Sequence, residues 1–231
     1  MSKTSGFSID KVFMEEGGPD DCRQSDTRTH WRLYIGLTLV WLGVVGFGLW
    51  RMMVYSFTAS PPTPAAEHWP SFTRLEHSRT LPTLVLALHP HCSCSRATIE
   101  ELAIVAAHCK ENFSAQVLFY RPIKSMPSWS DTDLKSSALR IPGVHVIDDP
   151  GGAEAATFQA ATSGELFLYD TLGHLLFHGG ITASRGHAGD NYARHTVISL
   201  LNHDTTAQLR STPIFGCSLR SEHPPEVQRK P

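Results

Sequence analysis

An uncharged apolar run near the N-terminus constrains this chain most strongly. The run Leu33–Trp50, LYIGLTLVWLGVVGFGLW, contains no charged side chain, and Met52–Phe57 continues it after the single Arg51. A run of this length can span a lipid bilayer, where the backbone must satisfy its own hydrogen bonds as a helix. The sequence therefore predicts one transmembrane helix over residues 30–57. A buried helix of a soluble protein is the alternative.

Arginine residues are unequally distributed around this run. Arg23, Arg28 and Arg32 precede it closely, whereas only Arg51 follows it before Arg74. The positive-inside rule therefore predicts a single-pass protein of the cell membrane, with a cytoplasmic N-terminus and a periplasmic or extracellular C-terminal domain. A cleaved signal peptide is disfavoured, because a long polar segment precedes the run and no Ala-x-Ala site follows it.

The chain outside the predicted span divides into four segments. Residues 1–29 mix Gly, Pro and Asp with scattered polar residues, which predicts a disordered cytoplasmic tail. Residues 58–79 are rich in proline near their start and predict an extended, stiff linker. A folded domain is expected over residues 80–204, followed by a C-terminal tail over residues 205–231.

Composition excludes several classes of function. The formal net charge is −2 and the chain has no long run of Lys and Arg, so we expect no nucleic-acid partner. The sequence also lacks a Gly-rich phosphate loop, a Gly-x-Ser-x-Gly elbow and a His-Glu-x-x-His motif. Nucleotide use, serine hydrolysis and zinc-dependent proteolysis are therefore disfavoured.

Strand-like and helix-like patterns alternate within the folded domain. The predicted strands are Leu81–Leu88, Ala115–Tyr120, Val144–Ile147, Glu165–Tyr169 and His174–His178, and the last two form a hairpin. The first predicted helix begins near Arg96 and includes Thr98–His108. The others are Asp131–Leu139, Ala153–Ala161 and a final helix capped by Asp190 or Asn191. This order predicts an α/β fold with a parallel core sheet, an antiparallel hairpin on one side and helices on both faces.

Two cysteines stand where the first strand gives way to the first helix, in His89-Pro90-His91-Cys92-Ser93-Cys94-Ser95. A helix N-terminus stabilises a cysteine as thiolate, the form that attacks disulfides and binds soft metals. Cys92 comes first and is expected to be the more exposed, so it is the candidate nucleophile. Cys94 is the candidate resolving thiol. Two buried structural thiols are the alternative.

Three other cysteines are distributed along the chain. Cys217 lies in Phe215-Gly216-Cys217 and is either a third catalytic thiol or metal ligand, if the tail folds back, or an unpaired thiol. Cys109 lies on the apolar face of the first helix and is expected to pack in the core. Cys22 is expected to be an incidental thiol in a reducing compartment.

His89 and His91 flank Pro90, so an extended segment places them on one side. Together with Cys92 and Cys94 they offer a donor set for Cu(I) or Zn(II), and copper binding or delivery is the alternative function. Electrostatic tuning of a cysteine pKa is the preferred role, because so short a cluster does not readily wrap four donors around one ion.

The segment Ser184–Asn191 precedes the final helix. Its Arg185 and His187 are expected either to face the cysteines or a partner, or to belong to a simple helix-capping loop. Gly186 and Gly189 would permit tight backbone turns in either case.

Residues Leu81 to Asn202 resemble the thioredoxin-like superfamily, and within it the membrane-anchored, extracytoplasmic thiol-disulfide oxidoreductases of the TlpA and ResA kind. Ile147-Asp148, Phe158 and the segment Thr162–Asp170, TSGELFLYD, carry this resemblance. Gly179–Thr182, Ser184–His187 and Thr212–Cys217 are similar to segments of the RedB-type proteins. The resemblance implies a thioredoxin-like fold and a protein redox partner.

Two positions depart from that family pattern. Cys92-Ser93-Cys94 replaces the usual Cys-x-x-Cys, and Gly164 stands where the family has a cis-proline. A disulfide across one intervening residue closes a small, strained ring, and such a bond is comparatively easy to reduce.

We therefore expect a membrane-anchored oxidoreductase or electron-transfer protein in which Cys92, Cys94 and Cys217 exchange disulfides with a protein partner. It would require no cofactor. In the copper-binding alternative, His89, His91, Cys92 and Cys94 hold the metal. A thioredoxin-shaped interaction module without turnover is the third possibility.

Overall fold

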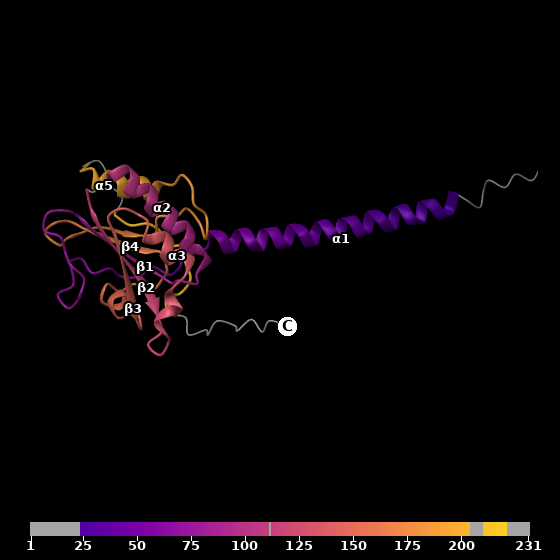
Figure 1. Cartoon of the computed structure of the whole chain (residues 1–231). Helices are drawn as coiled ribbons and strands as arrows, with labels where there is room; N and C mark the ends of the chain where they lie inside the picture. Colours follow the sequence, from indigo (N-terminus) through magenta and orange to yellow (C-terminus); the bar gives the residue numbers. More distant parts are fainter. Residues whose placement is uncertain (1–23, 111, 204–209, 221–231) are drawn as a thin grey trace, which may run out of the picture. The chain divides into compact units, whose positions relative to one another are not determined.

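The computed structural model describes residues 24–110, 112–203 and 210–220, and the chain divides into two compact units, Met1–Arg51 and Met52–Pro231. Helix α1 spans Gln24–Phe57, six residues earlier than the predicted start at residue 30. Residues 24–29, expected to be disordered, thus belong to this helix (Figure 1). The rest of the predicted N-terminal tail, including Cys22, lies outside the described residues.

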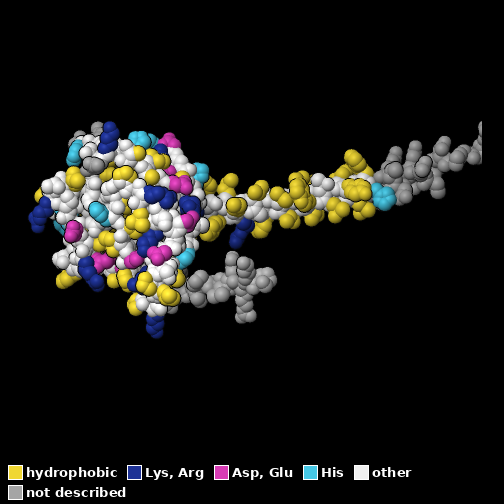
Figure 2. All heavy atoms as spheres, viewed as in Figure 1, with side chains coloured by type: hydrophobic (Ala, Val, Ile, Leu, Met, Phe, Trp, Pro, Cys, Tyr) yellow, Lys and Arg dark blue, Asp and Glu magenta, His cyan; other side chains and the backbone are white. Residues whose placement is uncertain are grey.

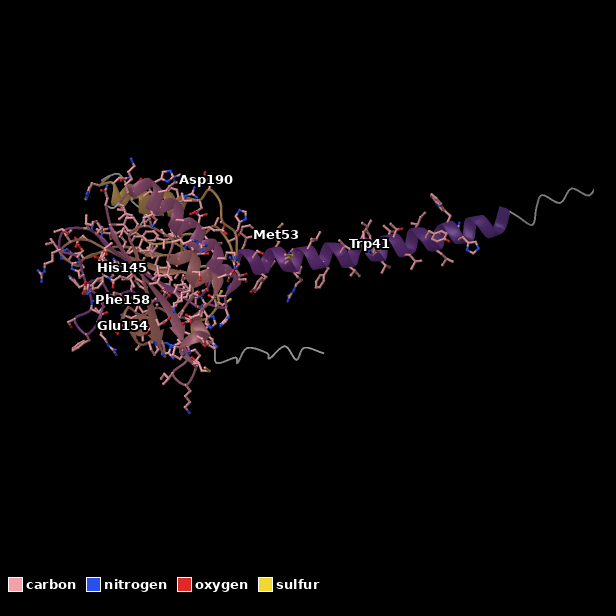
Figure 3. The ribbon with its side chains drawn as sticks, in the orientation of Figure 1. Trp41, Met53, His145, Glu154, Phe158 and Asp190 are labelled. Atoms are coloured by element: carbon pink, nitrogen blue, oxygen red, sulfur yellow. The ribbon has the colours of Figure 1, made fainter. Side chains whose placement is uncertain are left out.

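Helix α1 contains the apolar run. The stretch His30–Phe57 is long and apolar enough to cross a membrane, and none of its most apolar window is buried. Hydrophobic side chains cover the exposed surface of this helix (Figure 2), and Trp41 projects from it (Figure 3). An apolar surface left exposed in this way is one that a membrane-spanning segment would present to lipid.

A five-stranded mixed sheet with the order β3-β2-β1-β4-β5 forms the centre of the second unit. The strands are β1 (Thr83–Leu88), β2 (Ser114–Arg121), β3 (Val144–Pro150), β4 (Glu165–Tyr169) and β5 (Leu175–Gly179). The first three are parallel to one another, whereas β4 pairs antiparallel with β1 and β5 antiparallel with β4. The predicted α/β class, parallel core and lateral hairpin are confirmed.

Helices cover both faces of this sheet because the side chains of a strand alternate between its faces. Leu84, Leu86 and Leu88 of β1 pack in the core that includes residues of α2 (Ser93–Cys109), α3 (Asp133–Ala138) and α5 (Tyr192–Leu201). Figure 1 shows α2 and α5 together on this face. Val85 and Ala87 pack on the opposite face, where α4 (Ala153–Thr157) contributes Ala155. A short 3₁₀ helix, η1 (Pro127–Ser130), completes the described elements.

Several element boundaries differ from the prediction, among them the end of α4 at Thr157 rather than Ala161, and two of the differences have local reasons. Helix α2 begins at Ser93 rather than near Arg96, because Cys92 adopts the extended conformation of an N-cap residue. Strand β3 continues to Pro150, and the buried carboxylate of Asp149 accepts hydrogen bonds from the backbone N–H groups of Glu154 and Ala155. The cap of α5 is Asn191, whose side chain accepts from the backbone N–H of Arg194.

Residues 58–79, expected to form a linker, contain no regular helix or strand and contact the rest of the domain. The backbone N–H of Trp69 donates to the carbonyl of Gly173 (2.7 Å), and that of Ser60 donates to the carbonyl of Ile214 (2.8 Å). Leu75 is buried, and the Trp69 ring lies edge-on to Tyr169 with centroids 5.3 Å apart. The apolar side chains of this segment gain more by covering the sheet than by remaining in water.

Candidate functional site

Three thiols from two distant parts of the chain meet in the second unit. The sulfur atoms of Cys92, Cys94 and Cys217 all lie within 4.8 Å of one another. Cys92 and Cys94 are buried and Cys217 is half-buried, and none of them is in a disulfide. The structure therefore brings together all three residues that the sequence predicts as catalytic thiols, and we call them the thiol cluster.

The turn between β1 and α2 positions the first two thiols. The backbone N–H of Cys92 donates to the carbonyl of His89 (3.1 Å), and the N–H of Ser95 donates to the carbonyl of Cys92 (3.1 Å). These bonds close the turn and start the helix, so Cys92 is the N-cap and Cys94 lies in the first helical turn. Both sulfurs are consequently near the partial positive charge of the helix N-terminus.

A short antiparallel pairing brings in the third thiol. Ser163 donates its backbone N–H to the carbonyl of Cys217 (2.8 Å), and Leu219 donates its own to the carbonyl of Ala161 (2.8 Å). A Cβ atom on Gly216 would lie 1.8 Å from the carbonyl oxygen of Ser163. The tail segment 216–219 therefore approaches residues 161–163 so closely that only glycine fits at position 216.

Arg185 also binds this tail segment, through its side chain. Its Nη1 donates to the carbonyl of Gly216 and its Nε to the carbonyl of Thr58 (3.3 Å). The guanidinium carbon lies 5.1 Å from the centroid of the Tyr55 ring, a cation–π contact. Of Arg185 and His187, the two side chains singled out in Ser184–Asn191, Arg185 lies near the thiols. Its charge lowers the pKa of Cys94 and Cys217, but larger opposing effects raise both.

The carboxylate of Glu165 shapes the loop to which the tail is paired. This fully buried side chain accepts hydrogen bonds from the backbone N–H groups of Ala161 (2.9 Å) and Thr162 (3.1 Å). It also contacts His178 Nε2 (2.8 Å) and accepts from the hydroxyl of Thr63. Glu165 was not among the residues predicted for this site, although an acidic residue at the start of an apolar strand is a usable signal.

The three thiols of the cluster differ in pKa. Burial alone would raise the pKa of the Cys92 thiol, but hydrogen bonds from Cys217, the backbone of Cys94 and the Ser95 hydroxyl outweigh it and lower the pKa. Burial and the adjacent Cys92 raise the pKa of Cys94, and the same two effects raise that of Cys217 to about 12. Cys92 is therefore the thiol of the cluster that loses its proton most readily.

The two predicted histidines lie beside the thiol cluster but point to other partners. His89 Nδ1 accepts from the backbone N–H of His91 (3.2 Å), and the His89 ring stacks on Tyr120 at 5.6 Å. His91 Nε2 lies 3.1 Å from the carbonyl oxygen of Trp129. Burial and the neighbouring His91 lower the pKa of His89 to about 4, so His89 is neutral near pH 7. The main groups that lower the pKa of Cys92 are hydrogen-bond donors rather than these histidines.

Cys92 is less exposed than the sequence suggested. It is 6% exposed, the same as Cys94, because the helix begins earlier and the tail covers the junction. It nevertheless lines a surface hollow of about 280 Å³, together with His91, Arg96 and Asp133. Cys109, by contrast, is almost fully buried at the far end of α2, and burial raises the pKa of its thiol. Its predicted place in the core is confirmed.

Comparison with known proteins supports the fold and leaves the family open. No family model matches the chain, and no curated protein sequence matches it. An uncharacterized conserved protein from Geobacillus kaustophilus is similar in structure, with a TM-score of 0.51 and 17% identity, over 73% of this chain and 94% of that one. A hypothetical protein from Sinorhizobium meliloti gives a TM-score of 0.52 and 18% identity, over 73% and 97% of the two chains.

A secreted Mycobacterium tuberculosis disulfide oxidoreductase is a more distant match, with a TM-score of 0.38 and 12% identity, over 55% of this chain and 84% of that one. The deciding observation is the topology: parallel β1 and β2 joined by α2, then the β4–β5 hairpin and α5 packed beside α2. The domain has a thioredoxin-like fold.

Gly164 stands where the resemblance described above would place a cis-proline, and it has its own backbone geometry. Gly164 precedes β4, has a φ of +95°, and donates its N–H to the carbonyl of Ala87 (2.8 Å). No cis peptide bond occurs among the described residues. A positive φ of this size is one that glycine adopts readily and other residues rarely do.

Proposed function

We propose that this protein is a membrane-anchored thiol-disulfide oxidoreductase whose nucleophile is Cys92. The observation that carries the proposal is the thiol cluster itself: a Cys92 thiol of lowered pKa at a helix N-terminus, with two further thiols within 4.8 Å. A sulfur with a lowered pKa is a ready nucleophile at neutral pH, and adjacent thiols can complete the exchange.

The exchange proceeds in two steps. The Cys92 thiolate attacks one sulfur of a partner's disulfide, forms a mixed disulfide and releases the other partner sulfur, which takes up a proton. A second thiol of the cluster then loses its proton and attacks Cys92, which releases the first partner sulfur. The first partner sulfur takes up the proton that the second thiol lost, whereas the proton on the other partner sulfur comes from water, which received one when Cys92 ionised. The partner disulfide becomes a dithiol and two cluster thiols become a disulfide, a transfer of two electrons.

Cys217 is the better candidate for the second thiol. A Cys92–Cys94 disulfide would close a ring across one residue, whereas Cys217 approaches Cys92 from a separate segment and imposes no such small ring. Its position on a tail held by backbone hydrogen bonds also lets its sulfur move toward Cys92 without disturbing helix α2.

Anchoring and orientation belong to the same proposal. Helix α1 would cross the membrane once, and the arginine residues before it favour a cytoplasmic N-terminus. The thioredoxin-like domain would then meet its redox partner outside the cytoplasm, where disulfides persist. Protease protection in oriented vesicles, with an epitope at each end, tests this orientation.

A disulfide exchange assay with the full chain in detergent micelles tests the function. We expect the reduced protein to reduce a model peptide disulfide, and Cys92→Ser to abolish the reaction. Cys109→Ser is the matched control and should retain the rate of the parent protein, because its thiol is remote and buried. The proposal would be refuted if both variants reduced the peptide disulfide at the rate of the parent protein.

A further inference from the structure

We propose that the reduced thiol cluster is also a three-coordinate site for a soft monovalent metal ion, Cu(I), with the sulfur atoms of Cys92, Cys94 and Cys217 as its only ligands. This inference does not depend on the oxidoreductase function. It also differs from the copper site expected from the sequence, because it replaces both histidines by Cys217.

The spacing of the three sulfurs suits one shared ion. A metal–sulfur bond is about 2.3 Å long, so a planar three-sulfur site separates its sulfurs by about 4.0 Å. The observed separations are all within 4.8 Å. Small side-chain rotations close the remaining gap, since the tail that carries Cys217 is an extended segment and Cys92 is a helix cap.

The donor set favours Cu(I) over Zn(II). Thiolates are soft ligands that select Cu(I), Zn(II) or iron–sulfur clusters, and structural zinc almost always takes four ligands. Within the described residues, the group of possible ligands at this place consists of the three cysteines. The nearby imidazoles are turned toward other groups, His91 toward Trp129 and His89 toward the His91 backbone.

The surroundings suit a compact, negatively charged metal centre. Cys92 and Cys94 are each only 6% exposed, so the ion would be largely shielded from water and from oxidants. Arg185 supplies a positive charge on the side of the tail, and the helix N-terminus supplies a partial one.

Competition with a chromophoric Cu(I) chelator tests the proposal on the full-length reduced protein under anaerobic conditions in detergent. We expect one Cu(I) per chain. Each of Cys92→Ser, Cys94→Ser and Cys217→Ser should weaken binding by 100-fold or more. The double variant His89→Ala/His91→Ala and the variant Cys109→Ser should bind within threefold of the parent protein.

X-ray absorption spectroscopy of the copper-loaded parent protein gives a measurement that does not depend on any variant. Three sulfur neighbours and no imidazole nitrogen are expected. A nitrogen neighbour, or a loss of affinity in the histidine variant as large as in Cys217→Ser, would overturn the ligand set in favour of the histidine site. A copper-bridged dimer in size-exclusion chromatography, or tighter binding of Zn(II) than of Cu(I), would overturn it too.

The copper test and the exchange test fail independently. If Cu(I) does not bind but the peptide disulfide is still reduced through Cys92, only the metal inference is lost. If Cu(I) binds through three sulfurs and no exchange occurs, the oxidoreductase proposal is lost and the metal site stands.

Discussion

The two segments that supply the thiols are built by different physical means. The Cys92–Cys94 turn is held by short-range hydrogen bonds at the start of a long helix, with Cys94 within its first turn. The tail segment 216–219 is held by backbone hydrogen bonds to residues far away in sequence and by the side chain of Arg185. The first segment is rigid because its helix is rigid, whereas the second depends on a few replaceable contacts.

This contrast indicates a division of labour. A fixed nucleophile needs a fixed environment, because the pKa of Cys92 depends on donors that stay in place. A resolving thiol needs freedom to move toward the sulfur that it attacks. Weakening the tail contacts should therefore change the behaviour of the thiol cluster without unfolding the sheet.

The largest effect is expected from Gly216→Val, which places a side chain against the carbonyl of Ser163. Overpacking of this kind costs about 1–3 kcal/mol. If the tail detaches, hydrogen exchange at Leu219 should accelerate by roughly 5- to 150-fold, which is that cost expressed as a rate ratio. Mass spectrometry of exchanged peptides measures it.

Ser218→Val is the control for this variant, because Ser218 is an exposed neighbour in the same extended segment. It should leave the exchange rate at Leu219 close to that of the parent protein. Equal acceleration in both variants would mean that any substitution detaches the tail, and that the contact of Gly216 with Ser163 is not what holds it.

The next effect concerns the loop under the tail. Burial would raise the pKa of Glu165, but its bonds with His178, Thr63, Ala161 and Thr162 outweigh burial and hold the pKa below its usual range. A carboxyl with a lowered folded-state pKa stabilises the fold above its ordinary pKa, and this stability is lost as the pH falls through the folded value. The domain should therefore lose stability below about pH 4.3, the ordinary pKa of a glutamate.

Glu165→Gln should cost about 1.5–3 kcal/mol at pH 7, the range for hydrogen bonds to a charged group, and should flatten this acid dependence. Thermal unfolding followed by circular dichroism between pH 3 and 7 measures both. Glu100→Gln, at an exposed position of α2, serves as the control. An unchanged acid profile in Glu165→Gln would show that another carboxyl is responsible.

A smaller effect is expected from Cys217→Ser. The change removes the thiol that donates to the Cys92 thiolate and puts a hydroxyl in its place, so part of the hydrogen bonding remains. The pKa of Cys92 should rise, and alkylation of Cys92 by iodoacetamide near neutral pH should slow. A pH profile of the alkylation rate, read by mass spectrometry, reports the direction. A fall in this pKa would contradict the donor role of Cys217.

The smallest effect is expected from Cys109→Ala. This thiol packs in the core at the end of α2, away from the turn and the tail. Losing its sulfur should cost about 1 kcal/mol of stability, in line with one buried methylene-sized group. Disulfide exchange and Cu(I) binding should both be unchanged. A change in either one would place Cys109 in communication with the thiol cluster.

The same contrast explains how much could be predicted from the sequence. The strand and helix patterns of the domain come from alternating and helical apolar spacing, and that spacing predicted the sheet and the order of its elements correctly. The turn with Cys92 and Cys94 was recognisable for the same reason, since it lies between two such patterns. Only the start of α2 and the low exposure of Cys92 differed.

The tail could not be predicted to the same degree. Its pairing with residues 161–163 is made by backbone groups, which every residue type has, so no pattern of side chains announces it. The proline-rich segment 58–79 was expected to be a linker for a related reason. Its composition indicates an extended chain but does not indicate what the chain packs against. Glu165 was missed because its role depends on its four hydrogen-bond partners, and no regular sequence spacing relates them to it.

The thiol cluster has an odd number of members. When any two of its sulfurs join, one is left over, so the oxidised protein still carries an unpaired thiol beside a disulfide. That leftover thiol can attack the internal bond and shift it from one pair to another. A centre of this kind therefore keeps one nucleophile even in its oxidised form, although a reductant must restore the second thiol before another partner disulfide can be reduced.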